Sequence, residues 1–274
     1  METPENAIVF YDIEGYNRKK VCEGDDLMPI IHAHRGASAY APENTLPAFR
    51  LALEQHTDGI ETDIHLTLDN QFVVCHDGSI GRTSTGEGEI QNMTVGQLKQ
   101  YDFGVKFGPA FAGTPIPTLD ELLEVVRDVD PINIEIKGPF REDADMAAAY
   151  RLLYETLVKF GCVERTLFSS FGHSWLRDLK AQYPDLRTGL LYGGDPKTPE
   201  ETLEMVRTYN ADAIHPYLHS INKDIVDACL ANGIDVNVWT VDSPEDIATA
   251  VSYGVTGIIT NVPDRVRAYC EEHA

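Results

Sequence analysis

Short runs of β-branched and aliphatic residues alternate with longer segments of helical character along most of this chain. Within several short runs a polar residue occupies every second position, which is typical of strands with one face turned toward an interior. Eight strands are therefore predicted, at 30–34, 59–64, 132–136, 166–170, 187–191, 211–215, 235–240 and 257–260. Helices are predicted between and after them, at 45–56, 118–128, 143–160, 173–182, 199–209, 222–232, 244–252 and 263–272.

Local signals support the helix boundaries. Thr118, Asn222 and the Ser243-Pro244 pair stand where helices should begin, because such residues cap the free N–H groups of a first turn. Gly161, Gly233 and Gly254 stand where helices should end. Eight strands, each followed by a helix, predict a (β/α)₈ TIM barrel. A doubly wound open sheet is the competing arrangement, but no Gly-rich dinucleotide turn follows the first strand.

Two segments depart from the alternating pattern. We expect residues 1–28 to be an N-terminal extension and 29–274 to form the barrel domain, with an insertion at about 77–117 near the barrel mouth. An extra strand is predicted from Phe72 to His76. A two-residue turn at Asp69-Asn70 would pair it with the second strand and set His76 opposite Asp63.

Composition narrows the class of function. The chain has 274 residues and a formal net charge of -22, so its surface should repel nucleic acid and anionic lipid. No apolar stretch approaches the roughly 20 residues of a membrane span, and the N-terminus lacks a secretory pattern. Five cysteines without close pairs favour a reduced compartment. We therefore expect a cytoplasmic protein without nucleic-acid partners or stable membrane insertion; its oligomeric state is open, a homo-oligomer included.

Five carboxylate and imidazole side chains fall on four apolar strands. Such groups are costly to bury unless they are paired, metal-bound or catalytic. The carboxyl ends of barrel strands form the active site of this fold, and alternation turns each polar set toward the barrel axis. Three carboxylates suit Mg²⁺ or Ca²⁺, and two histidines suit proton transfer. The candidates are Glu61, Asp63 and Glu135 for the metal and His34 and His76 for acid/base catalysis, with Arg35 and Lys137 as cationic neighbours.

The other histidines receive less consequential interpretations. His32 should lie deeper in the barrel as a hydrogen-bonded core residue. His65 should leave the barrel rim as part of a loop. His215, at a strand end, is a weaker candidate for the pocket lining. Ser169 and Ser170 lack the turn motif of a serine hydrolase.

Several sequence blocks in this order resemble the glycerophosphodiester phosphodiesterase family, over about residues 30–268. These are HAHRGASAYAPENTLPAF, GIETDIHLTLDNQFVVCHDGSIGRTSTGEGEI, PTLDELL, INIEIKG, VNVWTVD and GIITNVPD. The resemblance implies a TIM barrel with a small insertion after the second strand. It also implies hydrolysis of a small glycerophosphodiester to glycerol 3-phosphate and an alcohol, with a divalent cation, Ca²⁺ or Mg²⁺.

The resemblance also implies roles at matching positions. His34 and His76 match the acid/base pair, and Glu61, Asp63 and Glu135 match the metal ligands. Substrate-binding positions are matched by Arg35, Lys137 and Trp239, the last as an aromatic wall of the pocket. Glu43 and Asn44 of the PEN motif should hold the first loop by hydrogen bonds.

The sequence leaves three questions open. It does not decide which histidine is the acid, or whether water or the glycerol hydroxyl is the nucleophile. Two rival functions also remain: a phosphodiesterase for larger lipids such as lysophospholipids or phosphoinositides, and a noncatalytic phosphodiester-binding protein. The complete set of two histidines and three carboxylates argues against the second rival.

Overall fold

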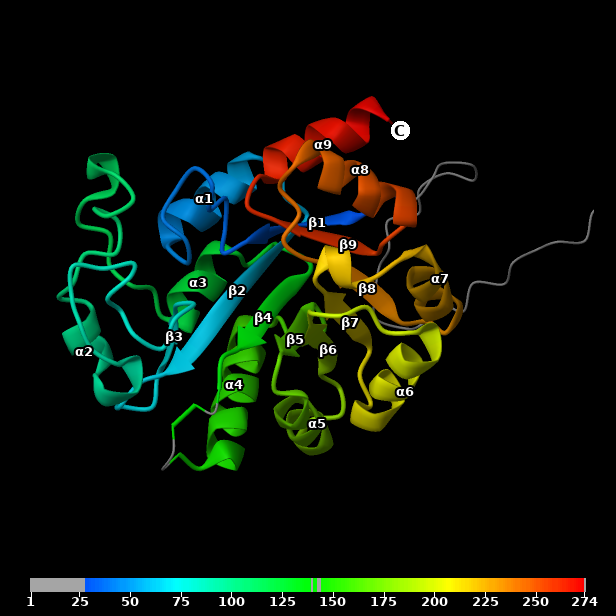
Figure 1. Ribbon diagram of the computed structural model, residues 1–274. Coiled ribbons are helices and arrows are strands. Elements are labelled where there is room, and N and C mark those ends of the chain that lie inside the picture. The colour runs from blue at the N-terminus through cyan, green and yellow to red at the C-terminus, as the bar shows by residue number, and fades with distance from the viewer. Residues whose placement is uncertain (1–27, 139, 142–143, 274) are drawn as a thin grey trace, which may run out of the picture.

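Parallel strands close into a ring around which the helices are arranged (Figure 1). The computed structural model describes residues 28–138, 140–141 and 144–273, so the predicted extension lies outside it, and the division at residue 28 stays a prediction. Neighbouring strands follow the order β1-β9-β8-β7-β6-β5-β4-β2, and pairing of β1 with β2 closes the barrel. These strands are β1 (Ile30–His34), β2 (Gly59–Leu66), β4 (Ile132–Ile136), β5 (Thr166–Ser170), β6 (Arg187–Tyr192), β7 (Ala213–Pro216), β8 (Asp235–Val238) and β9 (Gly257–Thr260).

A helix follows each barrel strand and covers the outside of the ring. The predicted capping residues act as expected: Thr118 and Glu121 form a reciprocal capping box at the start of α3, and Gly161 ends α4 in the left-handed conformation. The helices are α1 (Leu46–Glu54), α3 (Leu119–Val125), α4 (Met146–Phe160), α5 (His173–Gln182), α6 (Pro199–Tyr209), α7 (Lys223–Ala231), α8 (Pro244–Tyr253) and α9 (Pro263–Glu272). The (β/α)₈ prediction is confirmed.

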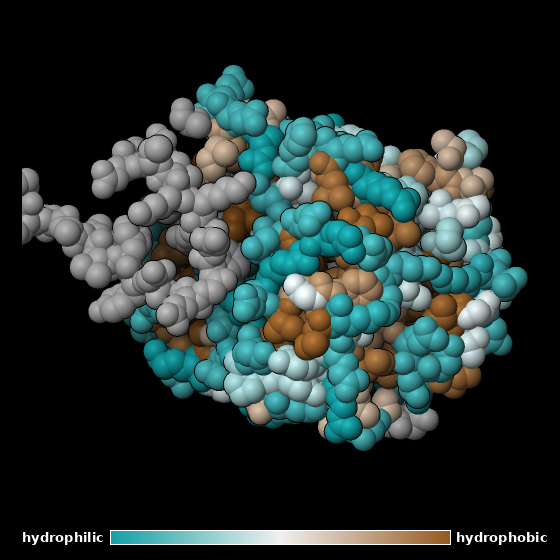
Figure 2. Space-filling model, turned by 180° about the vertical axis from the view of Figure 1, so that it is seen from behind, coloured by the Kyte–Doolittle hydropathy of each residue, from teal (hydrophilic) through white to brown (hydrophobic). Residues whose placement is uncertain are grey.

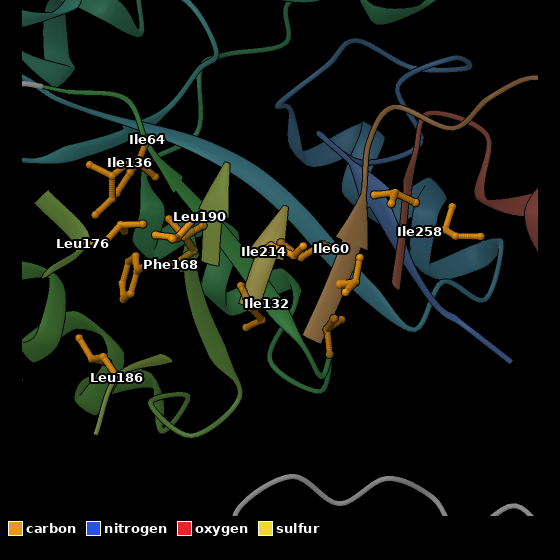
Figure 3. Packing of buried hydrophobic residues seen from close by; sticks show 14 of the residues in the cluster. Ile60, Ile64, Ile132, Ile136, Phe168, Leu176, Leu186, Leu190, Ile214 and Ile258 are labelled. Carbon is orange, nitrogen blue, oxygen red and sulfur yellow. The ribbon is translucent and has the colours of Figure 1, made fainter. Parts of the chain in front are cut away.

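The main hydrophobic core lies between the strands and this helix layer. Alternate residues of β2 and β4, among them Ile60, Ile64, Ile132 and Ile136, are at most 1% exposed and pack outward against the helices (Figure 3). Burying such a side chain contributes roughly 1.5–3 kcal/mol. The intervening positions of the same strands face the barrel axis, so the outward core leaves the inner positions to polar groups.

The segment between β3 (Phe72–Val74) and α3 lies beside the barrel, where α2 is labelled in Figure 1. It contains α2 (Val95–Leu98) and two short 3₁₀ turns, η1 (Ile90–Asn92) and η2 (Pro109–Phe111). A second hydrophobic cluster, which includes Ile80, Leu98, Phe103 and Ile116, packs on β3. The segment therefore has a small core of its own beside the barrel mouth.

The predicted hairpin register is wrong by one residue. The observed pairs are Ile64 with Val74 and Leu66 with Phe72, so Cys75, not His76, lies opposite Asp63. The turn spans three residues rather than two, because Asn70 adopts a left-handed backbone conformation with φ of 55°. A further η3 turn (Leu218–Ser220) follows β7.

The outer surface is mixed in hydropathy. Hydrophilic residues cover much of the face seen in Figure 2, with smaller hydrophobic patches between them. Among the described residues, every helix is too short or too polar to cross a bilayer.

Candidate active site

The carboxyl ends of the barrel strands surround a cavity of about 90 Å³. Seven of the eight predicted site residues line it directly, and they come from β1, β2, β4, the end of β3 and the end of β8. The eighth, Asp63, is fully buried beneath them. The lining residues are His34, Arg35, Glu61, His76, Asn133, Glu135, Lys137, Ser169, Phe171, Leu191, Trp239, Thr240 and Ile259.

Strand register brings the three carboxylates together. The parallel pairing sets His34 beside Glu61 and Asp63 beside Glu135. One ligand atom from each of Glu61, Asp63 and Glu135 lies within 4.8 Å of the other two. The structure therefore joins the candidate metal ligands in one cluster, although they are up to 74 positions apart in the chain.

Two cations lie against this cluster. Lys137 Nζ is 2.7 Å from Glu135 Oε1 and 3.2 Å from Asp63 Oδ1. Arg35 Nε is 3.2 Å from Asp63 Oδ2, and its NH1 is 3.1 Å from Glu43 Oε1. Arg35 therefore contacts Glu43 of the PEN loop and also lines the cavity.

The PEN loop supports the cluster from the side, as expected. Asn44 Nδ2 donates to Asp63 Oδ2 at 2.7 Å, and Thr62 Oγ1 donates to Asn44 Oδ1 at 3.0 Å. Asn44 and Arg35 therefore both contact Asp63 Oδ2, and Lys137 lies beside Oδ1. Apart from Lys137, no described residue donates a hydrogen bond to that buried oxygen.

The electrostatics of the cluster fit a bound cation. Burial raises the pKa of Glu61 well above its ordinary value, and Asp63 and Glu135 add to the effect. Burial also raises the pKa of Glu135, to about 8. Burial acts in the same direction on Asp63, but Lys137 and Arg35 outweigh it and hold the pKa of Asp63 well below its usual range. A hard divalent cation would satisfy the crowded oxygens.

The two histidines lie in different hydrogen-bonding surroundings. His34 Nδ1 is 2.7 Å from Asn261 Oδ1, and its Nε2 is 3.8 Å from Glu61 Oε2. Burial, and then Arg35, lower the pKa of His34 to about 4. His76 Nδ1 is 2.6 Å from Asp77 Oδ1. The neutral amide of Asn261 therefore holds the His34 ring, and the carboxylate of Asp77 holds the His76 ring.

A network from the inserted segment supports His76. Arg82 Nε donates to Asp77 Oδ2 at 2.6 Å, and its terminal nitrogens donate to Glu43 at 2.7 and 2.8 Å. The hydrogen bond from Arg82 lowers the pKa of Asp77 to about 2. The insertion thus connects His76, through Asp77 and Arg82, to the loop that carries Arg35.

Aromatic residues form one wall of the cavity. Trp239 Nε1 donates to the carbonyl oxygen of His215 at 2.7 Å, which fixes the indole. The Phe171 ring stands nearly perpendicular to it, with ring centroids 5.8 Å apart. Trp239 therefore lines the cavity, and its role in binding substrate stays a prediction.

The remaining histidines differ in part from the predictions. His32 is buried in the barrel as expected. His65 is not in a loop, because β2 continues to Leu66, and its Nε2 contacts the carbonyl oxygen of His76 at 3.1 Å. His215 is fully buried between Asn133 and Asn237 and does not line the cavity.

Four contributing residues were not singled out from the sequence: Asp77, Arg82, Asn261 and Asp242, the last of which accepts a hydrogen bond from Asn261 Nδ2. Two of them could have been found by the same rule that found the others. Asn261 directly follows β9 and Asp242 follows β8, so both stand at the carboxyl ends of barrel strands. Asp77 and Arg82 belong to the inserted segment, whose path the sequence did not determine.

Comparison with known proteins agrees with this geometry. A family model described as "Glycerophosphoryl diester phosphodiesterase family" matches residues 34–265. A glycerophosphodiester phosphodiesterase of Caldanaerobacter subterraneus subsp. tengcongensis is 40% identical over 240 residues, which is 86% of this chain and 95% of the relative. A probable glycerophosphodiester phosphodiesterase 1 of Mycobacterium tuberculosis is 34% identical over 262 residues, covering 89% and 93% of the two chains.

Solved structures show the same similarity. An Oleispira antarctica phosphodiesterase, in complex with the product sn-glycerol-3-phosphate, superposes with a TM-score of 0.80 at 26% identity, over 89% of this chain and 97% of the other. A putative glycerophosphodiester phosphodiesterase from Galdieria sulphuraria gives a TM-score of 0.79 at 28% identity, over 89% and 98%.

Proposed function

The chain belongs to the glycerophosphoryl diester phosphodiesterase family and is a glycerophosphodiester phosphodiesterase, and we propose that it works with a divalent cation and two histidines. The substrate is a small glycerophosphodiester, and the products are glycerol 3-phosphate and the free alcohol. The product named in the Oleispira antarctica complex supports this substrate class.

One observation carries the proposal: three buried carboxylates converge within 4.8 Å at the rim where two histidines line the same cavity. Without a cation, three carboxylates buried close together would destabilise the folded protein. Asp63 Oδ1, which Lys137 contacts at 3.2 Å but to which no other described residue donates a hydrogen bond, offers a ligand atom. Glu61, Asp63 and Glu135 are therefore the proposed ligands, and their oxygen atoms suit Ca²⁺ or Mg²⁺.

The cation, when bound, supplies positive charge that holds a nonbridging phosphate oxygen and stabilises developing negative charge. Arg35 and Lys137 are proposed to share that task, since both side chains reach the cavity. Lys137 also neutralises Glu135 and Asp63 through its close contacts. These positive groups give an acidic protein a local site for an anionic substrate.

His34 and His76 are proposed to carry the protons. Hydrolysis needs one group to accept a proton from the nucleophile and another to protonate the leaving alkoxide. In both rings Nδ1 is engaged, by Asn261 in one case and Asp77 in the other. Nε2 is therefore the proposed proton-transfer atom of each histidine. Trp239 is proposed to bind substrate as the apolar wall beside them.

The proposal is tested by glycerol 3-phosphate release from glycerophosphocholine with added Ca²⁺ or Mg²⁺, before and after chelation. His34→Ala and His76→Ala should each abolish turnover while the circular dichroism spectrum is retained. His273→Ala, which changes an exposed histidine at the C-terminus, is the matched control. Near-normal turnover in either site variant removes that histidine from the mechanism, and activity that survives complete chelation removes the cation.

A lysophospholipid substrate in the same assay separates the small-molecule activity from action on larger lipids. Turnover of the lysophospholipid at a higher kcat/KM than glycerophosphocholine would contradict the proposed substrate class.

A further inference from the structure

His34 is held by a chain of side chains that comes from the opposite end of the sequence. Its Nδ1 is 2.7 Å from Asn261 Oδ1, across 227 positions. Asn261 Nδ2 in turn donates to Asp242 Oδ2 at 2.6 Å. Pairing of the first barrel strand, β1, with the last, β9, brings these residues together, so the contact depends on the complete ring.

Asp242 determines which way the Asn261 amide points. An ionised carboxylate can only accept hydrogen bonds, and Asp242 accepts from the Asn261 backbone N–H at 2.8 Å as well as from Nδ2. Thr260 Oγ1 also donates to it, at 3.1 Å. A flipped amide would place two acceptor oxygens 2.6 Å apart. The amide oxygen must therefore face His34.

This orientation dictates the tautomer of His34. An amide oxygen only accepts, so His34 Nδ1 must carry the hydrogen of that bond. The lone pair of the neutral ring then lies on Nε2, the atom on the side of Glu61. Ser38 links the Asn261 side chain to the backbone of His34, since its hydroxyl lies 2.6 Å from Asn261 Oδ1 and 2.7 Å from the carbonyl oxygen of His34.

We propose that Asn261 and Asp242 are positioning residues that hold His34 as the Nδ1–H tautomer, with Nε2 free to accept a proton from the reacting groups. The inference rests on the proposed role of His34. A second imidazole in the same cavity, His76, is held directly by a carboxylate. The two histidines are therefore oriented differently. Asp77 contacts His76 directly, whereas Asp242 acts on His34 through Asn261.

The alternative is that Asp242 and Asn261 only join the loops after β8 and β9. Asp242→Asn separates the two roles. Asparagine at 242 still hydrogen-bonds to Asn261, but it can donate or accept, so the amide orientation is no longer imposed. A loop-joining role predicts little change in catalysis, whereas the positioning role predicts a mixed His34 tautomer and slower chemistry.

The direct measurement is the ¹⁵N spectrum of histidine-labelled protein, with the His34 signals identified by their loss in His34→Gln. We expect the wild-type ring to be protonated at Nδ1 and the Asp242→Asn ring to show both tautomers. Asn261→Leu should lose the Nδ1–H signal pattern as well. Asp224→Asn, which removes an exposed carboxylate on α7, controls for the change in charge.

The turnover rate should fall in the same variants in which the ¹⁵N spectrum shows a changed His34 tautomer. For Asp242→Asn and Asn261→Leu we expect kcat to fall on the order of 10²-fold, as for other small misplacements of catalytic groups, with KM changed less than about threefold. The double variant Asn261→Asp with Asp242→Asn reverses the donor and acceptor between the pair but keeps an acceptor toward His34. It should recover kcat relative to Asp242→Asn alone.

The spectrum also separates this inference from the proposed function. A wild-type ring protonated at Nε2 overturns the inference whatever the kinetics show. So does a fall in kcat without a change of tautomer, or a change of tautomer without a fall in kcat. Full turnover by His34→Ala, in contrast, overturns the role of His34 itself.

Discussion

Replacing Glu61 by glutamine should make the metal-free protein more stable while it abolishes metal binding. Glutamine preserves the shape of the side chain and its ability to accept the hydrogen bond from the Arg35 backbone N–H, which is 3.2 Å from Glu61 Oε2. It removes one negative charge from the carboxylate cluster. The same substitution therefore has opposite effects on two states of the protein.

The magnitude follows from the spacing. At 4.8 Å and an effective dielectric constant of about 20, two carboxylates repel by about 3.5 kcal/mol. Lys137 and Arg35 lie close to Asp63 and Glu135, which leaves Glu61 the least compensated of the three. Proton uptake relieves part of this repulsion, because burial raises the pKa of Glu61. We therefore expect a gain of about 1–3 kcal/mol without metal.

Bound metal should make wild type more stable than Glu61→Gln, the reverse of the order expected without metal. A cation at 100 times its dissociation constant adds about 2.7 kcal/mol to a protein that binds it only when folded. For a chain of this size each kcal/mol moves Tm by about 2–4 °C. Wild type should thus gain several degrees with excess Ca²⁺ or Mg²⁺, and Glu61→Gln should gain almost none.

The assay is thermal unfolding by calorimetry, with chelator and with excess cation, for wild type, Glu61→Gln and the control Glu124→Gln. Glu124 is an exposed acid on α3, and its ion-pair partner among the described residues is Arg127, three positions further along the chain. The control should follow wild type in both conditions. An undiminished metal shift in Glu61→Gln would remove Glu61 from the ligand set. A large loss of stability in chelator would show that Glu61 holds the fold rather than a cation.

Three further predictions test other parts of the structure. Asp77→Asn should lower kcat at least about tenfold without unfolding the protein, because the amide can present a donor to His76 Nδ1 and reverse its tautomer; wild-type kcat would contradict this. His215 is buried with its pKa lowered to about 3, chiefly by burial, against about 6.5 when unfolded. Its stabilisation is complete above pH 6.5 and is lost as the pH falls toward 3, by about 1.4 kcal/mol per pH unit. Urea unfolding at pH 7 and 5.5 should therefore show a smaller difference for His215→Asn than for wild type, and an equal difference would refute the argument. Phe168 is fully buried in the main core, so Phe168→Ala should cost about 3–5 kcal/mol of unfolding free energy; a loss below 1 kcal/mol in urea unfolding would show that the site repacks.

The order of elements and the principal site residues could be predicted from the sequence because both depend on local pattern. Alternation along 59–64 places Glu61 and Asp63 on one face whatever surrounds the strand. The apolar neighbours Ile60 and Ile64 then have to face the helices, as they do. Strand ends in a parallel barrel meet at one rim, so convergence of His34 with Glu61 and of Asp63 with Glu135 follows from register.

The prediction of the hairpin register failed because the register depends on the backbone conformation of a single residue. The left-handed Asn70 lengthens the turn by one residue, and a slip of one residue exchanges the two faces of a strand. His76 reaches the cavity nevertheless, because β3 ends at Val74 and the chain is no longer bound to the alternation of a strand. The predicted location of His76 at the cavity was correct, although the predicted hairpin register was not.

By itself, then, the chain specified which side chains each strand turns inward, because alternation is a property of neighbouring residues. Only closure of the ring determined how those side chains are oriented. The hydrogen bond from His34 to Asn261 spans 227 positions, and the Arg82 link to Glu43 spans 39. Contacts of that kind depend on the distance between loops, which is set by the packing of the whole barrel rather than by any local run of residues.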